Sequence, residues 1–308
     1  MPPAWPPRIA ASPATTDYAY LCVDGGLMYN EPLELARRIL AGPAGRNPRS
    51  GRAATRAILM IDPFPNVAPF SEDYAPKDDI LAVFKGMFGA LKNQARFKPD
   101  ELVLAAEEDV YSCFMIAPRR KLADGSPSAF PMASNALGGF GGFLTEAFRE
   151  HDFQLGRRNG QRFLQRHFCL PAAGADRNPL FDQWSATARS HHQFTEDGVT
   201  FLPIVPLIDG AATPIPSPAW PAFGEADLES LRGRVAKRVE LVTGRLTDQY
   251  VKNWAARTLV RGVLLMKRGS LVDDIMETIR KSLADTGLLA GTVAPRARID
   301  DFITVPHE

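Results

Sequence analysis

The stretch Tyr20-Leu-Cys-Val-Asp24-Gly25-Gly26-Leu-Met-Tyr-Asn30-Glu-Pro32-Leu-Glu-Leu-Ala36 decides the fold that we expect for this chain of 308 residues. The apolar and aromatic run from Tyr18 to Val23 predicts a buried strand. Gly25 and Gly26 can adopt positive φ, so the chain can turn sharply after this strand and leave the carboxylate of Asp24 uncrowded. Because open α/β sheets place their chemistry at the carboxyl ends of strands, Asp24 is a candidate catalytic carboxylate.

A helix is expected directly after this turn. Asn30 is a suitable helix cap and Pro32 suits the first helical turn. Leu33, Ala36, Arg37 and Leu40 then follow at helical spacing, and Gly42-Pro43 predicts the end of the helix. A strand, a turn and a helix in this order are also common around an Asp that has no chemical role, and this alternative stays open on the local pattern alone.

The longer pattern, Asp-Gly-Gly followed by Asn-x-Pro and Ala36, resembles the Asp-Gly-Gly box of patatin-like phospholipases. Residues 88–94 and residues 129–170, with Gly138-Gly139-Phe140-Gly141-Gly142, resemble the carboxyl-terminal region of a bacterial subgroup of that family, so the similarity extends from about residue 16 to about residue 210. It implies an α/β chain that forms the carboxyl-terminal portion of a patatin-like three-layer α/β/α fold. It also implies that Asp24 is the base of a Ser–Asp dyad that acts without His.

A patatin-type hydrolase needs two further parts, and neither is found in this sequence. The first is a Gly-x-Ser-x-Gly elbow for the nucleophile, and the second is a glycine-rich loop for the oxyanion. Ser126 is followed by Pro127 where the elbow would turn, and Ser134 has no glycine at the required spacing. Because the resemblance places the elbow well upstream of the Asp box, we expect an amino-terminally truncated patatin-like protein that is inactive alone.

The resemblance implies lipid or phospholipid esters as substrates of the complete protein, in lipid degradation, with neither a metal ion nor an organic cofactor. Whether this chain is itself an enzyme is left uncertain, because the nucleophile is missing. The alternative is a non-catalytic lipid- or protein-binding module derived from the same family. A truncated product with no role is a third interpretation, since removing the centre of a parallel sheet leaves unpaired strand edges.

Composition limits the remaining function classes. A hydrophobic fraction of 45%, with 18 Phe and 4 Trp, is enough for a sizeable core. The net charge of +1 gives no general attraction to nucleic acid. Three widely separated cysteines make neither a metal cluster nor a disulfide framework. The sequence contains no segment that resembles a signal peptide or a transmembrane helix, so we expect a cytoplasmic protein, with peripheral membrane contact left open.

The chain is expected to divide into a truncated patatin-like α/β domain, residues 1–215, and a helical extension, residues 216–308, after a proline-rich connection. A buried strand is predicted at residues 57–61, another strand at residues 111–116, and an amphipathic helix at residues 78–97. Hydrophobic spacing predicts three helices in the extension, at residues 227–247, 250–268 and 271–288.

Four further clusters are candidates for chemistry. The glycines of residues 138–142 are expected to serve a tight turn or close packing, because they lack the spacing of a phosphate-binding loop. His151-Asp152 could assist catalysis, but we expect a solvated helix face here, together with Arg157, Arg158, Arg162 and Arg166. A metal site at His191-His192 lacks a third ligand. Residues 107–109 are acidic and are expected to form a polar turn.

Overall fold

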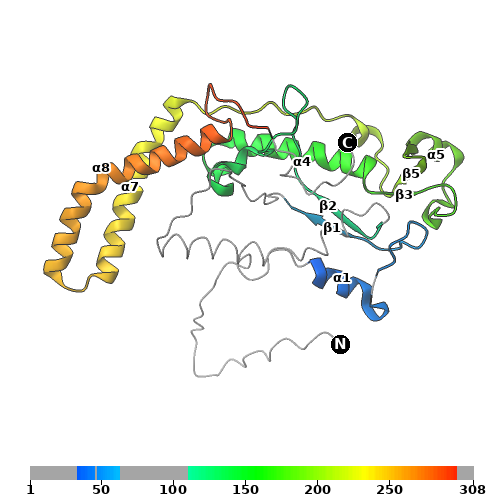
Figure 1. The fold of residues 1–308 in the computed structure, drawn as a ribbon, viewed down its shortest axis with the longest axis horizontal. Coiled ribbons are helices and arrows are strands. Elements are labelled where there is room, and N and C mark those ends of the chain that lie inside the picture. Colours follow the sequence, from blue (N-terminus) through cyan, green and yellow to red (C-terminus); the bar gives the residue numbers. More distant parts are fainter. Residues whose placement is uncertain (1–32, 46, 63–109, 297–308) are drawn as a thin grey trace.

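The computed structural model describes residues 33–45, 47–62 and 110–296, which form a mixed α/β fold (Figure 1). The described helices are α1 (Leu33–Ala41), α4 (Glu146–Arg166), α5 (Ala186–His192), α6 (Asp209–Ala212), α7 (Glu225–Tyr250) and α8 (Trp254–Asp285). The described strands are β1 (Ile58–Ile61), β2 (Cys113–Ile116), β3 (Cys169–Pro171), β4 (Phe194–Glu196) and β5 (Val199–Pro203). Four 3-10 segments are η2 (Gly42–Ala44), η3 (Ala133–Gly139), η4 (Gly141–Phe143) and η5 (Pro179–Phe181).

Strands β1 and β2 pair in parallel, with Ile58 opposite Cys113. Both strands were predicted, but the expected burial of β1 is wrong, because Leu59 and Ile61 are exposed. Among the described residues, β2 is the one strand that pairs with β1. Successive side chains of β1 point to opposite faces of the pair, so Ile58 and Met60 are half-buried on one face while Leu59 and Ile61 are exposed on the other. A strand with one open face needs apolar residues at only every second position.

Helix α4 lies over this parallel pair and connects the two halves of the described fold (Figure 1). Its first turn is capped by Thr145, whose Oγ1 accepts a hydrogen bond from the amide of Ala147. Phe163 of α4 meets Phe114 of β2 edge to face, with ring centroids 6.1 Å apart. The carboxyl-terminal end of α4 leads directly into β3, so the same helix joins the parallel pair to a second sheet.

The second sheet is small and antiparallel, with the strand order β3-β5-β4. A two-residue turn joins β4 to β5, and both of its residues, Asp197 and Gly198, have positive φ (48° and 78°). This geometry suits a tight hairpin, because its twist matches that of the flanking strands. The sheet packs around a local core in which Phe181 is fully buried with Leu170 and Leu202.

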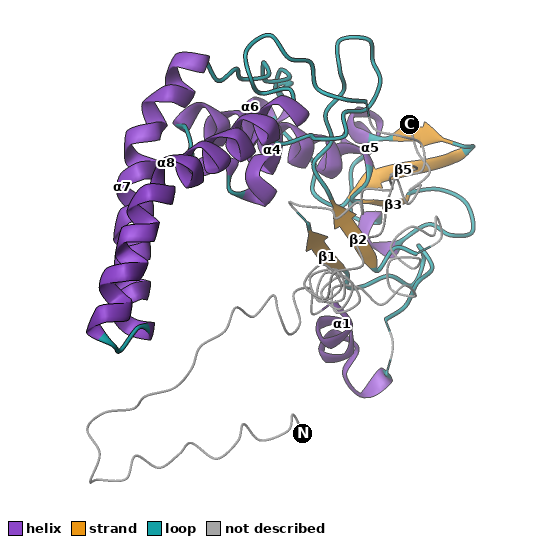
Figure 2. Ribbon diagram, turned by 60° about the vertical axis from the view of Figure 1, so that its left-hand side comes forward, coloured by secondary structure: helices purple, strands orange, loops and turns teal. Residues whose placement is uncertain are grey.

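Helices α7 and α8 form a long antiparallel hairpin that projects away from the strands (Figure 2). Ion pairs tie the two helices together along its length. They join Arg280 to Glu225, Arg232 to Asp273, Arg268 to Glu240 and Arg261 to Asp248.

The helical hairpin shares the largest hydrophobic core with α4 and η3. This core contains Phe148 of α4 and Ala133 and Ala136 of η3, packed against residues from α7, α8 and the turn after α8. The amide of Phe223 donates to the carbonyl of Leu288 at 2.7 Å, which fixes that turn against the start of α7. The base of the hairpin is therefore built into the body of the fold, and the domain boundary near residue 215 stays a prediction.

The number of helices expected in the carboxyl-terminal part is wrong. Residues 250–268 and 271–288 were predicted as two helices, but α8 runs without a break through Gly269. A Cβ built at Gly269 would meet no atom within 4 Å, so this glycine marks neither a turn nor a close approach. An isolated helical glycine costs only about 1 kcal/mol, and the packing of α8 along α7 outweighs that cost.

Candidate functional site

The five residues predicted to form the site, Asp24, Gly25, Gly26, Asn30 and Pro32, lie outside the described residues. The predicted strand at residues 18–23, the amphipathic helix at 78–97 and the acidic residues 107–109 lie outside them as well. The helix expected after the Asp-Gly-Gly pattern is described. Helix α1 begins at Leu33 and ends at Ala41, as the sequence predicts. Gly42 then adopts a φ of +56°, which completes the predicted stop.

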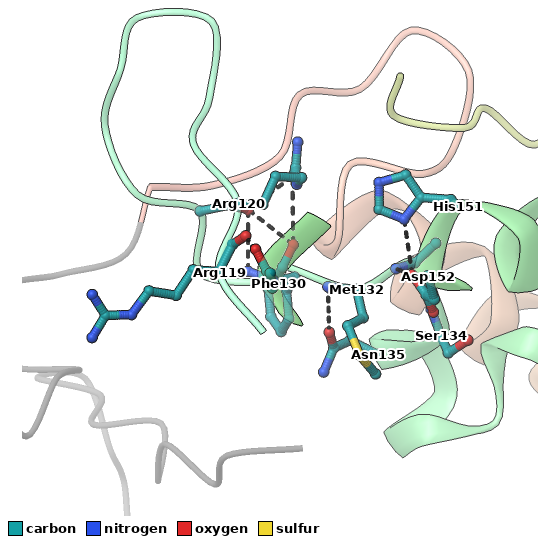
Figure 3. A network of polar contacts seen from close by, with 11 residues as sticks. Arg119, Arg120, Phe130, Met132, Ser134, Asn135, His151 and Asp152 are labelled. Atoms are coloured by element: carbon teal, nitrogen blue, oxygen red, sulfur yellow. Dashed lines mark hydrogen bonds and ion pairs between the residues drawn. The ribbon is translucent and has the colours of Figure 1, made fainter. Parts of the chain in front are cut away.

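The carboxylate of Asp152, on the first half of α4, lies at the centre of a network of polar contacts (Figure 3). Its Oδ1 accepts a hydrogen bond from the amide of Ala133 at 2.7 Å, and its Oδ2 accepts one from the amide of Ser134 at 2.9 Å. The Nδ1 atom of His151 lies 2.8 Å from the same Oδ1. Asp152 thus caps the amino-terminal end of η3 from a neighbouring helix.

The pKa of Asp152 is lower than its ordinary value of 3.8. Burial alone would raise this pKa, but hydrogen bonds from His151, from the side chain of Ser134 and from the amides of Ser134 and Ala133 together outweigh that effect. A carboxylate stabilised in this way is a weak proton acceptor near neutral pH. Ser134 lies beside an Asp, but that Asp is poorly suited to activate it.

His151 is buried, with only 4% of its surface exposed. Its ring meets the edge of Trp220 at a centroid distance of 4.9 Å, and no described group hydrogen-bonds its Nε2 atom. The guanidinium of Arg120 lies 3.6 Å from the centroid of the same Trp220 ring. Burial lowers the pKa of Arg120 to about 10, which leaves it charged at neutral pH.

These contacts correct the expectation of a solvated helix face for His151 and Asp152. The pair is covered because η3 and Trp220 fold over the first two turns of α4. The same expectation is confirmed further along α4 for Arg157, Arg162 and Arg166, which are exposed, whereas Arg158 is half-buried. Since the free nitrogen of His151 is enclosed, the pair positions elements of the fold and offers no surface to a substrate.

The glycine cluster serves close packing, as predicted. A Cβ at Gly141 would lie 3.0 Å from the Ala133 carbonyl oxygen, and one at Gly142 would lie 2.9 Å from Ser134 Oγ. Gly138 and Gly139 adopt positive φ values of 65° and 99°, which few other residues reach without strain. These glycines let η3 and η4 fold against α4.

The structure also contains a groove of about 380 Å³ between α4 and residues 210–218. Gln161 fills the polar part of this region. Its Nε2 donates to the carbonyls of Ala211 and Thr213, both at 2.7 Å, and its Oε1 accepts from the amide of Ile215 at 3.1 Å. Arg157 is the one titratable residue in the lining, so the groove holds no acid–base pair and no general base that could activate the hydroxyl of Thr213.

His191 and His192 stack edge to face against each other at the end of α5, and His192 also meets Trp184. Within the described ranges, no three His, Cys, Asp or Glu side chains come close enough to hold a metal ion. The Gly125-Ser126 segment forms a surface turn in which Ser126 donates two hydrogen bonds to Asp124. None of the described helices combines the length and the apolar composition needed to cross a bilayer.

Sequence reasoning missed Arg120, Trp220 and Gln161, which hold the described polar contacts together. Trp220 donates from Nε1 to the carbonyl of Gly287 at 2.8 Å, in addition to its contacts with His151 and Arg120. A tryptophan in a proline-rich connection is a weak signal of such a role. The three partners of Trp220, namely Gly287, His151 and Arg120, each lie 67 or more residues from it along the chain. No local sequence pattern could therefore have predicted these contacts.

Comparisons with known proteins show a similarity but no family. No family model matches the sequence, and no solved structure matches it. The chain is similar to the uncharacterized protein y4iI of Sinorhizobium fredii, with 34% identity over 320 residues. The match covers 98% of this chain but only 44% of that protein, so the chain spans less than half the length of the relative that it matches.

Proposed function

We propose that this chain contributes the acid half of a patatin-type Ser–Asp hydrolase that acts on lipid or phospholipid esters. The observation that carries the proposal is the pattern Asp24-Gly25-Gly26 followed by Asn30-x-Pro32, which leads into helix α1 at Leu33. The parallel pairing of β1 with β2 supports it, because parallel sheets present side chains at the carboxyl ends of their strands.

In the proposed reaction, Asp24 accepts the proton of a serine hydroxyl while the serine attacks the ester carbonyl. Asp24 returns this proton to the leaving oxygen, and the alcohol departs as the acyl-enzyme forms. Asp24 then accepts a proton from the water that attacks the acyl-enzyme and returns it to the serine, which releases the carboxylic acid. The serine must come from a polypeptide segment that these 308 residues do not include, since they contain no Gly-x-Ser-x-Gly. The similar Sinorhizobium protein has room for such a segment, because more than half of it has no counterpart here.

A fluorophosphonate serine-hydrolase probe followed by intact-mass measurement tests the proposal. The chain alone, shown to be folded by circular dichroism, is expected to form no adduct. A longer polypeptide from the same reading frame, with an upstream Gly-x-Ser-x-Gly, is expected to react at that serine. In that longer protein, Asp24→Asn should slow labelling at least about 100-fold, as loss of a general base does, and the exposed Asp124→Asn should not.

Two results would refute the proposal. One is an upstream reading frame without a Gly-x-Ser-x-Gly, and the other is a labelling rate that Asp24→Asn leaves unchanged. The absence of a nucleophile from this chain favours one alternative, a non-catalytic module that binds lipid or protein. That alternative predicts vesicle or protein binding with no ester hydrolysis by the longer polypeptide.

A further inference from the structure

The outer part of the α7–α8 hairpin, residues 234–268, exposes a large set of apolar side chains. We call it the distal hairpin. Tyr250 and Trp254 flank its turn and are 73% and 80% exposed, and Met266 is 80% exposed. Six further apolar residues of this segment are also exposed, namely Leu241, Val242, Leu246, Leu259, Val263 and Leu265. A surface of this kind on a folded protein usually marks a contact site.

The distal hairpin is also strongly basic, although the whole chain is nearly neutral. It contains nine Lys or Arg residues and two Asp or Glu residues, against a net charge of +1 for all 308 residues. Both acids are engaged inside the hairpin, where Glu240 pairs with Arg268 and Asp248 pairs with Arg261. The excess positive charge is therefore concentrated on one projecting element.

Six cations of the distal hairpin have no carboxylate partner among the described residues, and all six are exposed. They are Arg234, Lys237, Arg238, Arg245, Lys252 and Lys267. Lys252 lies in the turn itself, between the two exposed aromatic residues. The cations and the apolar side chains thus occupy the same end of the hairpin.

The turn is held in shape without using its aromatic side chains. Asn253 Oδ1 accepts hydrogen bonds from the amides of Ala255 and Ala256 at 2.9 and 3.3 Å. The guanidinium of Arg257 donates to the carbonyl of Val251 at 3.0 and 2.9 Å. Because these contacts order the backbone, Tyr250 and Trp254 are free to meet another surface without a loss of internal packing.

We propose that the distal hairpin docks onto the surface of a phospholipid membrane that contains anionic lipids. Peripheral binding of this kind needs two contributions, apolar side chains that enter the boundary of the acyl chains and cations that face the headgroups. Trp and Tyr are favoured at this boundary, since one end of each side chain is apolar and the other is polar. The distal hairpin, whose backbone projects from the fold in Figure 2, supplies all of these among its exposed side chains.

Charge complementarity favours this partner over the two main alternatives. A second copy docked tip to tip would bring two excess positive charges together. A nucleic acid would match the charge but would leave exposed leucine, valine and methionine side chains in water. This inference does not depend on the proposed hydrolase, because none of its residues belongs to the Asp24 pattern.

Co-sedimentation with vesicles tests the proposal, using the full chain. Vesicles that contain phosphatidylglycerol are expected to bind the protein, and vesicles of phosphatidylcholine alone are expected to bind it far more weakly. High salt should reduce the difference, because it screens charges near the surface. Lys252→Gln combined with Lys267→Gln should lower the partition coefficient about 25-fold, at about fivefold for each cation.

Tyr250→Ser combined with Trp254→Ser should lower binding at least about tenfold, through the loss of apolar contact. Phe143→Ser and Val293→Ser are the matched controls, since both residues are exposed (83% and 86%) but lie outside the hairpin. Brominated lipids should quench wild-type fluorescence, and Trp254→Phe should remove most of that quenching. Circular dichroism of each variant establishes that the fold is intact.

Several outcomes would overturn the proposal. They are absence of binding by the wild type, equal binding to neutral and anionic vesicles, and a loss in the hairpin variants no larger than in the controls. Sedimentation velocity adds a fourth, because a dimer that the aromatic double variant dissociates would assign this surface to a second copy. Binding to a nucleic acid that depends on the lysines but not on the aromatic residues would be a fifth.

Discussion

Replacing Asp152 with Asn tests whether the network at the start of η3 stabilises the fold. The aspartate presents two oxygens to the amides of Ala133 and Ser134, the Nδ1 atom of His151 and the side chain of Ser134. Asparagine has the same shape but only one acceptor oxygen, so at least one donor then faces an NH2 group. The substitution also removes a negative charge at the amino-terminal end of η3, where it is favourable.

The size of the expected loss comes from these contacts. A partly buried N–H that loses its acceptor costs about 1–3 kcal/mol, and hydrogen bonds to a charged group lie in the upper part of that range. We therefore expect Asp152→Asn to lower the free energy of unfolding by about 2 kcal/mol at neutral pH. Urea unfolding followed by tryptophan fluorescence measures this, because Trp220 contacts the adjacent His151. Asp124→Asn, which removes an exposed carboxylate from a surface turn, should cost only a small part of that loss.

The pH dependence supplies a second arm of the same experiment. The pKa of Asp152 in the folded protein lies below its ordinary value of 3.8. Its contribution to stability is therefore fully present above about pH 4 and is lost as the pH falls through the lower, folded-state pKa. The difference between wild type and Asp152→Asn should stay constant near neutral pH and shrink in acid. A loss no larger than that of the Asp124 control, or a difference that persists in strong acid, would refute the reasoning.

Three further results are expected. Gly287→Ala should destabilise the protein by more than about 2 kcal/mol, because Gly287 has a φ of +70° and its Cβ would overlap the backbone of the next turn. The control Gly291→Ala, at a glycine with a φ of +87° and open space around it, reports the backbone cost alone. Equal losses of stability in thermal unfolding would contradict this prediction. Phe148→Ala should cost about 3–5 kcal/mol in urea unfolding, since Phe148 is fully buried, and the exposed Phe143→Ala should cost little. Burial raises the pKa of the Cys169 thiol to about 12. Iodoacetamide at pH 8 should therefore leave Cys169 unmodified until the protein unfolds. Rapid labelling of Cys169 in the folded chain, detected by peptide mass, would disprove its enclosure.

Elements set by local sequence were predicted well. Helix α1 has an apolar spacing of 3.6 residues and a Gly-Pro stop, and its bounds agree with these signals. Strand β2 was predicted from a short apolar run before Ala-Pro. The hairpin turn at Asp197-Gly198 was not predicted, although Asp-Gly between two apolar runs is a local signal that is typical of this turn.

Elements that depend on distant partners were predicted poorly. The continuity of α8 through Gly269 depends on ion pairs and apolar contacts with α7, which lies many residues earlier. The exposure of Leu59 and Ile61 depends on what packs against their face of the strand pair, and an apolar run cannot report that packing. The burial of His151 and Asp152 depends on η3 and Trp220, which approach α4 from opposite directions along the chain.

The sequence by itself determined the local elements, the packing role of the glycines at 138–142, and the Asp24 pattern on which the proposed hydrolase rests. Those features are encoded within a few neighbouring residues, through φ preferences and hydrophobic spacing. Tertiary structure alone decided that an apparent His-Asp catalytic pair is an enclosed structural network. It alone also decided that the basic and apolar residues of α7 and α8 gather at one projecting end. Burial and surface charge are properties of the assembled chain, because they depend on which distant segments exclude water from each side chain.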